Sequence, residues 1–121
     1  MTKENKELLL KDLCARLPYN IICKVEFRES GEYKSKNMFL SCVFTDEAYF
    51  TTESGSIYSN EYNPYLFPLS SMTKEMLEDL SAYIDIKNAY VAVEFFNSHH
   101  IDYRGLIEKG LAIDATGLNI Y

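Results

Sequence analysis

The first helix is predicted by the spacing of apolar residues near the start of the chain. Between Lys3 and Leu17, apolar side chains gather on one stripe of a helical wheel drawn at about 100° per residue. Pro18 disfavours helical backbone at the residue before it, so this helix should end at Leu17. The stripe consists of Leu9, Leu10, Leu13, Cys14 and Leu17, and the charged residues elsewhere on the wheel are Glu7, Lys11, Asp12 and Arg16.

A strict alternation of apolar and polar residues then predicts strands. In IICKVEFRE (21–29) every second side chain is apolar, which is typical of a half-buried strand. A second strand follows a turn at 30–32, and EAYFTT (47–52) and SIYSNEY (56–62) are two further candidates. Four short strands with close turns predict an antiparallel meander, either open or curled like a barrel. The inward face of the second strand is expected to carry Met38, Leu40, Cys42 and Phe44.

The later part of the chain is expected to be helical. Thr73 is suited to cap a helix in 70–84, with Met72 and Leu77 at the positions of a hydrophobic staple. NAYVAVEFFNSHH (88–100) is rich in strand-forming residues, but its polar positions cluster on a wheel, so we expect a helix. RGLIEKG (104–110) should form one last turn closed by Gly110. The core-facing stripe of the helix in 70–84 contains Met76, Leu77, Leu80, Tyr83 and Ile84.

These patterns predict a single α+β domain over residues 1–121: an N-terminal helix, a four-stranded antiparallel meander, then two to three C-terminal helices. The net charge of −6 is spread along the chain, without the acidic runs of a DNA mimic or the basic stripe of a duplex binder. The apolar runs are too short for a signal peptide or a membrane span, which favours a cytoplasmic protein without membrane contact.

Three cysteines without CxxC spacing favour reduced, buried thiols over a disulfide framework or a zinc site. Cys23 and Cys42 fall on inward positions of two candidate strands, so they could be neighbours in the core. We therefore expect no metal and no cofactor bound through cysteine.

Two adjacent histidines, His99 and His100, end the last long helix. Consecutive side chains on a helix diverge, whereas a shared metal ion needs histidines four residues apart or an HxH strand, so a metal site is not expected. His99 is expected to pack on the preceding phenylalanines with one ring nitrogen hydrogen-bonded. His100 is expected to close the helix, where a partly positive imidazole suits the negative end of the helix dipole.

A catalytic alternative uses the residues that follow this pair. His100 would act as a general base, Asp102 would orient it and Arg104 would bind an anion, as in a small-ligand-binding protein or hydrolase. No serine or cysteine lies in a nucleophile elbow such as GxSxG. We therefore favour a structural role, in which Asp102 and Arg104 form an ion pair or a cap that fixes the direction of the chain, or Arg104 binds tail carbonyls.

The other unusual segment is 48–68, where tyrosines are interspersed with Ser, Thr, Asn and Gly. Tyr58, Tyr62 and Tyr65 could offer a protein-binding surface of paratope-like composition, and the competing interpretation is a hairpin whose tyrosines cover the sheet. Stacking of nucleic-acid bases on these rings is disfavoured by the acidic residues nearby, which leaves a nucleic-acid accessory protein as a third hypothesis.

Three blocks, LLKDLCARLPYN (9–20), NPYLFPLSSMT (63–73) and HHIDYRGLIEKGLAID (99–114), resemble a family of short uncharacterised proteins from gut anaerobic bacteria and their phages or mobile elements. The resemblance implies an accessory protein of phage or element origin and no particular activity. Members usually have glycine at the position of Asn20, and Asn is the residue that best retains a left-handed turn there. They often have arginine at the position of Phe67, so an anion bound by that side chain would be lost here.

The three blocks lie at junctions between predicted elements. If the junctions converge, Tyr19, Tyr65 and Tyr103 should lie near Arg104. We expect a non-catalytic protein-interaction module, monomeric or homodimeric, that binds another protein through the tyrosine-rich hairpin or through this junction surface at Tyr103 and Arg104.

Overall fold

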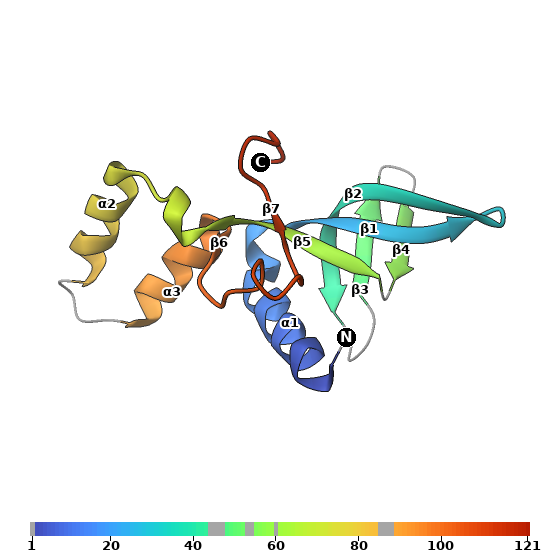
Figure 1. Ribbon diagram of the computed structural model, residues 1–121, viewed down its shortest axis with the longest axis horizontal. Helices are drawn as coiled ribbons and strands as arrows, with labels where there is room; N and C mark the ends of the chain where they lie inside the picture. Colours follow the sequence, from blue (N-terminus) through green and yellow to red (C-terminus); the bar gives the residue numbers. More distant parts are fainter. Residues whose placement is uncertain (1, 44–47, 53–54, 60, 85–88) are drawn as a thin grey trace.

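The computed structural model of the chain describes residues 2–43, 48–52, 55–59, 61–84 and 89–121. The predicted α+β architecture is confirmed, with a helix, then a sheet, then two further helices and a short tail (Figure 1). The helices are α1 (Lys3–Arg16), α2 (Lys74–Ile84) and α3 (Ala89–Ser98), with the short 3-10 helices η1 (Leu17–Tyr19) and η2 (Leu69–Ser71). The strands are β1 (Ile22–Glu29), β2 (Glu32–Val43), β3 (Ala48–Thr52), β4 (Gly55–Ser59), β5 (Tyr62–Pro68), β6 (Ile101–Asp102) and β7 (Ile113–Asp114).

The described strands form one mixed sheet in the order β4-β3-β2-β1-β5-β6, and β7 also pairs with β5. Strands β1 to β4 are the predicted antiparallel meander. The end of β4 reaches back to β1, because the Ser59 hydroxyl donates a hydrogen bond of 2.7 Å to the carbonyl of Glu26. Within the strands that the structure describes, no ladder joins β4 to β1, so the sheet is open and the barrel alternative is wrong.

Strand β5 was not predicted as a separate element, because Pro64 and Pro68 make the segment resemble a turn. Its first residues pair antiparallel with β1, with Pro64 opposite Cys23. Its later residues pair in parallel with β7 and then with β6. This one strand therefore connects the meander to the C-terminal elements.

An irregularity in β2 changes which side chains face the core. The pairing of β2 with β3 shifts between Leu40 and Cys42, as at a β-bulge. Met38 and Leu40 are buried as predicted, but Cys42 is exposed and Val43 packs against the core instead. Cys23 is buried whereas Cys42 is exposed, so the prediction that they are neighbours in the core is wrong, and Phe44 lies outside the described residues.

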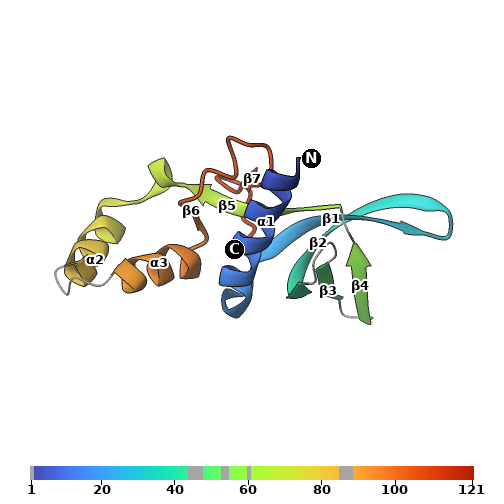
Figure 2. The ribbon, with the colours of Figure 1, turned by 90° about the horizontal axis from the view of Figure 1, so that it is seen from below.

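The molecule is elongated. Figures 1 and 2 show α2 and α3 together at one end, the long β1–β2 hairpin at the other, and α1 across the middle. The central core joins Leu9 and Leu13 of α1 to inward residues of β1, β2 and β5 and to Leu106 and Leu111 near the C-terminus. None of the helices in the described ranges has the length and apolar character needed to cross a membrane.

The connecting turns agree with the sequence in two places. Asn20, after η1, has φ 55° and ψ 51°, the left-handed conformation expected at that position. Residues 106–110 form the predicted last turn, which ends at Gly110 with φ 73° and with hydrogen bonds from Gly110 and Leu111 to Ile107 and Leu106.

Candidate functional site

The buried face of α1 contains an ion pair that the wheel placed outside the apolar stripe. Asp12 and Arg16 are both fully buried, and Arg16 Nε donates a 2.7 Å hydrogen bond to Asp12 Oδ2. Cys14, predicted on the buried stripe, is exposed. The helix is rotated relative to the prediction, so that Leu9 and Leu13 share the core face with two charged residues.

This ion pair is anchored by residues about ninety positions further along the chain. Arg16 Nη2 donates to the carbonyl of Ile101 (2.7 Å), and Arg104 Nη1 donates to Asp12 Oδ1 (3.0 Å). The Tyr103 ring lies against both guanidinium groups, with 5.4 Å from its centroid to Arg16 Cζ and 4.7 Å to Arg104 Cζ. These contacts join the first and last of the three blocks and place Tyr103 beside Arg104, as predicted. Tyr65 instead hydrogen-bonds Asn37, and the nearness of Tyr19 and Tyr65 to Arg104 stays a prediction.

Asp102 acts as a cap. Its two carboxylate oxygens accept hydrogen bonds from the backbone N–H groups of Leu106 (2.8 Å) and Ile107 (2.9 Å), at the start of the last turn. The predicted cap is therefore confirmed. Arg104 pairs with Asp12 of α1, so the alternatives of a local Asp102–Arg104 ion pair and of an Arg104 contact with tail carbonyls are wrong.

The two histidines diverge as expected. His99 stacks on Phe95 with 4.2 Å between ring centroids, and its Nδ1 lies 2.9 Å from the Phe95 carbonyl. His100 has φ 58°, which ends α3 in a left-handed residue, and its ring stacks on Tyr121 at 3.7 Å. The burial is the reverse of the expectation, because His99 is exposed and His100 is half-buried.

The predicted positive charge on His100 is wrong. Burial, together with the charge of Arg16, lowers the pKa of the His100 imidazole from 6.5 to about 4. The ring is therefore neutral near pH 7. Asp102 is already bonded to backbone N–H groups and does not orient this imidazole, so the geometry gives no support to a His100–Asp102–Arg104 catalytic group.

Several polar atoms in this junction are buried without a hydrogen-bond partner among the described residues. They are Arg16 Nη1, Asn97 Oδ1, His100 Nδ1 and Tyr103 Oη. Buried polar groups of this kind commonly bind ordered water. The junction is therefore a closed polar centre rather than an open site.

The tyrosines predicted to contact a partner are mostly interior. Tyr62 and Tyr65 are buried, and the Tyr65 hydroxyl donates a 2.7 Å hydrogen bond to Asn37 Oδ1. Tyr103 is half-buried and stacks on Phe96. Tyr58 pairs with Tyr49 across β3 and β4, and its side chain lies outside the described part of the chain. Tyr62 and Tyr65 are therefore not available for contact on the surface of the hairpin.

A more open site lies between α2 and the ends of α3 and β5. It is a mostly apolar groove with a cavity volume of about 390 Å³, within the range of ligand-binding pockets. We call it the α2 groove. Its lining comes from five segments, through Phe67, Ser71, Met76, His99, Ile101, Thr116 and Gly117.

Exposed leucines occur on the segments that line the α2 groove. Leu69 of η2, Leu77 of α2 and Leu118 of the tail are 51%, 50% and 49% exposed. Leu77 was predicted to face the core, but among the described side chains of α2 only Leu80 is buried. Leu77 is therefore an exposed apolar side chain next to Met76 of the groove, and exposed apolar surface of this kind is typical of interaction sites.

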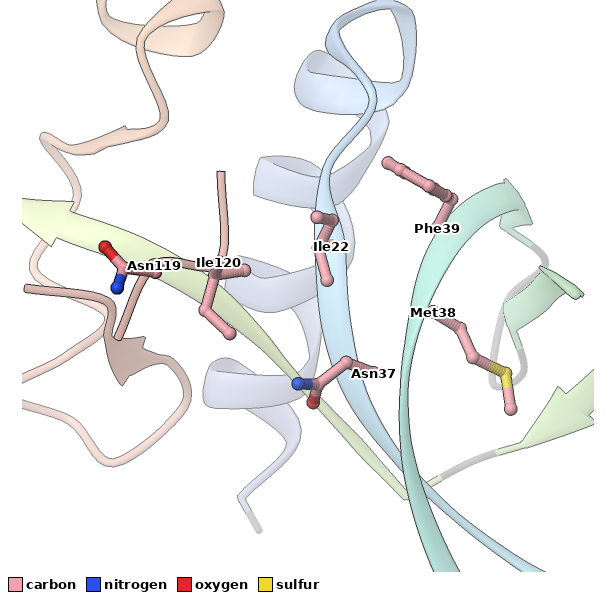
Figure 3. A pocket seen from close by; sticks show the side chains of 6 residues that line it. All are labelled: Ile22, Asn37, Met38, Phe39, Asn119 and Ile120. Atoms are coloured by element: carbon pink, nitrogen blue, oxygen red, sulfur yellow. The ribbon is translucent and has the colours of Figure 1, made fainter. Parts of the chain in front are cut away.

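A second cavity is smaller and lies beside the sheet. It has a volume of about 220 Å³, and Figure 3 shows Asn119 and Ile120 of the tail on one side of Ile22, Met38 and Phe39 of β2 on the other, and Asn37 below Ile22. Phe39 at its rim is 52% exposed. The hydroxyl of Tyr121 accepts a hydrogen bond from the Ile22 N–H (2.9 Å) and donates one to the Tyr65 carbonyl (2.9 Å). These bonds fix the tail across β1 and β5.

Comparison of the chain with protein-family models, with curated proteins and with solved structures finds no match.

The sequence did not reveal the roles of three residues: Asp12 and Arg16 in the buried ion pair, and Met76 in the α2 groove. The i, i+4 spacing of Asp12 and Arg16 on one helical face was a usable signal of an ion pair, although not of its burial. For Met76, the apolar stripe was visible in the sequence, but which part of it would stay uncovered depends on packing with α3.

Proposed function

We propose that this chain is a non-catalytic protein-interaction module that binds another protein at the α2 groove. The observation that carries the proposal is the exposed Leu77 of α2, beside a groove large enough for side chains of a partner. This location replaces the tyrosine-rich hairpin as the expected contact surface, because Tyr62 and Tyr65 are interior.

The polar junction supports the proposal indirectly. Its charged residues hold α1 against β6 and against Arg104, and this fixes one wall of the α2 groove at Ile101. A rigid wall lowers the entropy lost on binding. The resemblance to proteins of phages and mobile elements suggests a host or phage protein as the partner.

The proposal is tested by photo-crosslinking in the cells that express the protein. A photoreactive phenylalanine analogue is placed at Leu77, beside the groove, or at Phe39, which is equally exposed but lies on β2 far from it. We expect a discrete crosslinked product with another protein from position 77 only. Loss of this product on Met76→Asp, in a variant that keeps its thermal unfolding temperature, assigns the contact to the groove. No product at 77, or the same products at both positions, contradicts the proposal.

A further inference from the structure

The charges around the α2 groove have a consistent sign. On a helical wheel of α2, Glu75 and Asp79 lie on one side of Met76, and Leu77 and Leu80 lie on the other side. Both acids are exposed, and the exposed Lys74 lies on the far side of the helix from Met76. The groove therefore has an acidic border along α2, next to its apolar lining.

A third acid lies close to another part of the lining. Asp114 in β7 is exposed and lies two residues before Thr116, which lines the groove. Hydrogen bonds from Thr116 to the Asp114 carboxylate, including one of 2.9 Å from the backbone N–H, lower its pKa. The carboxylate is therefore ionised at neutral pH, and it adds negative charge beside the Thr116 part of the groove.

His99 adds a polar group to the lining of the groove. Its Nδ1 lies 2.9 Å from the Phe95 carbonyl and 3.1 Å from the Ser98 hydroxyl, so this nitrogen is engaged within the chain. Nε2 makes no hydrogen bond within the described residues, and it is the ring nitrogen open to a partner.

We propose that the α2 groove binds an amphipathic segment of a partner protein, whose apolar side chains enter beside Met76 and whose lysines or arginines lie against Glu75, Asp79 and Asp114. This inference rests on the proposed function and specifies the chemistry of the partner. Complementary charge at the rim of an apolar groove orients the incoming segment and speeds association. A helical segment with apolar residues at i, i+3, i+4 and i+7 has the required geometry.

The test uses two synthetic peptides of about 14 residues, the length at which an isolated helix becomes marginally stable. Both carry leucines at i, i+3, i+4 and i+7, with lysines in one peptide and glutamates in the other at the remaining charged positions. Each is titrated into the isotopically labelled full chain at low salt, and binding is followed by amide chemical shifts. We expect the lysine peptide to shift amides of η2, α2 and residues 99–101 and 116–117, and to bind about tenfold more tightly than the glutamate peptide.

Charge variants separate this recognition from general attraction to an acidic protein. Glu75→Lys with Asp79→Lys should remove the preference for the lysine peptide. Glu26→Lys with Glu32→Lys makes the same change in net charge at exposed positions of β1 and β2, and it should preserve the preference. Equal effects of the two double variants overturn the inference.

The peptides and the crosslinking address different claims. If both peptides bind the α2 groove equally, or if neither peptide shifts the groove amides, the inference of a basic partner is overturned. Neither outcome affects the crosslinking result from Leu77. Absence of crosslinks from Leu77 contradicts the proposed function itself, whatever the peptides do.

Discussion

Among single residues, Arg16 has the most demanding environment. Its guanidinium is fully buried and is held by one carboxylate of α1 and one distant backbone carbonyl. A buried ion pair adds little net stability over apolar residues, but removal of one partner leaves the other charge buried alone. Replacement of Arg16 alone should therefore destabilise the fold.

Arg16→Met is expected to lower the free energy of unfolding by about 3–5 kcal/mol, because Asp12 stays buried and loses one of its two cationic partners. Arg28→Met, at an exposed arginine over the Tyr33 ring, should cost less than about 1 kcal/mol. Chemical denaturation measures both. Combining Arg16→Met with Asp12→Leu should recover part of the loss, and a double variant less stable than Arg16→Met would contradict the stranded-charge explanation.

His100 should make stability depend on pH below neutrality. Its folded-state pKa of about 4 lies below the ordinary value of 6.5, so protonation favours the unfolded chain. The free energy of unfolding should be unaffected by this group above pH 6.5, and should fall as the pH decreases from about 6.5 to about 4. His100→Asn, which tolerates the positive φ, should flatten the curve between pH 6.5 and 5. A titration of the His100 ring by NMR with a midpoint near 6.5 would refute this account.

At the scale of elements, the irregularity in β2 makes the Cys42 thiol accessible. Cys14 and Cys42 are exposed, whereas Cys23 is buried opposite Pro64 of β5, and burial raises the pKa of its thiol. An aromatic disulfide reagent at pH 8 should therefore modify two thiols rapidly in the native protein and the third only in denaturant. In the variant Cys42→Ser only one thiol should react rapidly. Rapid reaction of a single thiol in the unmodified chain would mean that Cys42 faces the core.

The elements that the sequence predicted well are those in which local pattern and packing agree. Alternation in β1, the cap at Thr73 and the left-handed Asn20 are local properties, and all are confirmed. Ile21, immediately before β1, is buried, and so are Cys23 and Val25 within it, as the alternation requires. These features need no knowledge of distant contacts.

The features that were missed depend on distant parts of the chain. The rotation of α1 follows from contacts of Asp12 and Arg16 with residues 101–104, which a helical wheel does not contain. Strand β5 is formed by pairing with β1, β6 and β7 despite its two prolines. The bulge in β2 moved Cys42 outward, because one extra residue reverses the alternation beyond it. The candidate site was missed for the same reason, since the groove exists only after these segments meet.

At the scale of the whole molecule, the α2–α3 end has fewer stabilising contacts than the sheet. It lies apart from the central core in both views, and α2 packs chiefly on α3 (Figures 1 and 2). Amides of α2 should therefore exchange with deuterium faster than those of β1, which is hydrogen-bonded on both sides. Exchange measured by mass spectrometry checks this, and equal protection of the two elements would contradict it. Addition of the lysine peptide should slow exchange in α2 and leave β1 unchanged.

The long-range anchoring of Arg16 also has a consequence for synthesis on the ribosome. The guanidinium and the carbonyl that it contacts are 85 positions apart, so at about 5–20 residues per second helix α1 is made roughly 4 to 17 seconds before its anchor. If α1 docked onto nascent β1 during that interval, the Arg16 guanidinium would be buried without its hydrogen bond to the Ile101 carbonyl. Closure of the central core thus has to wait for residues 101–104, and the emerging chain presents the face of α1 to chaperones until then.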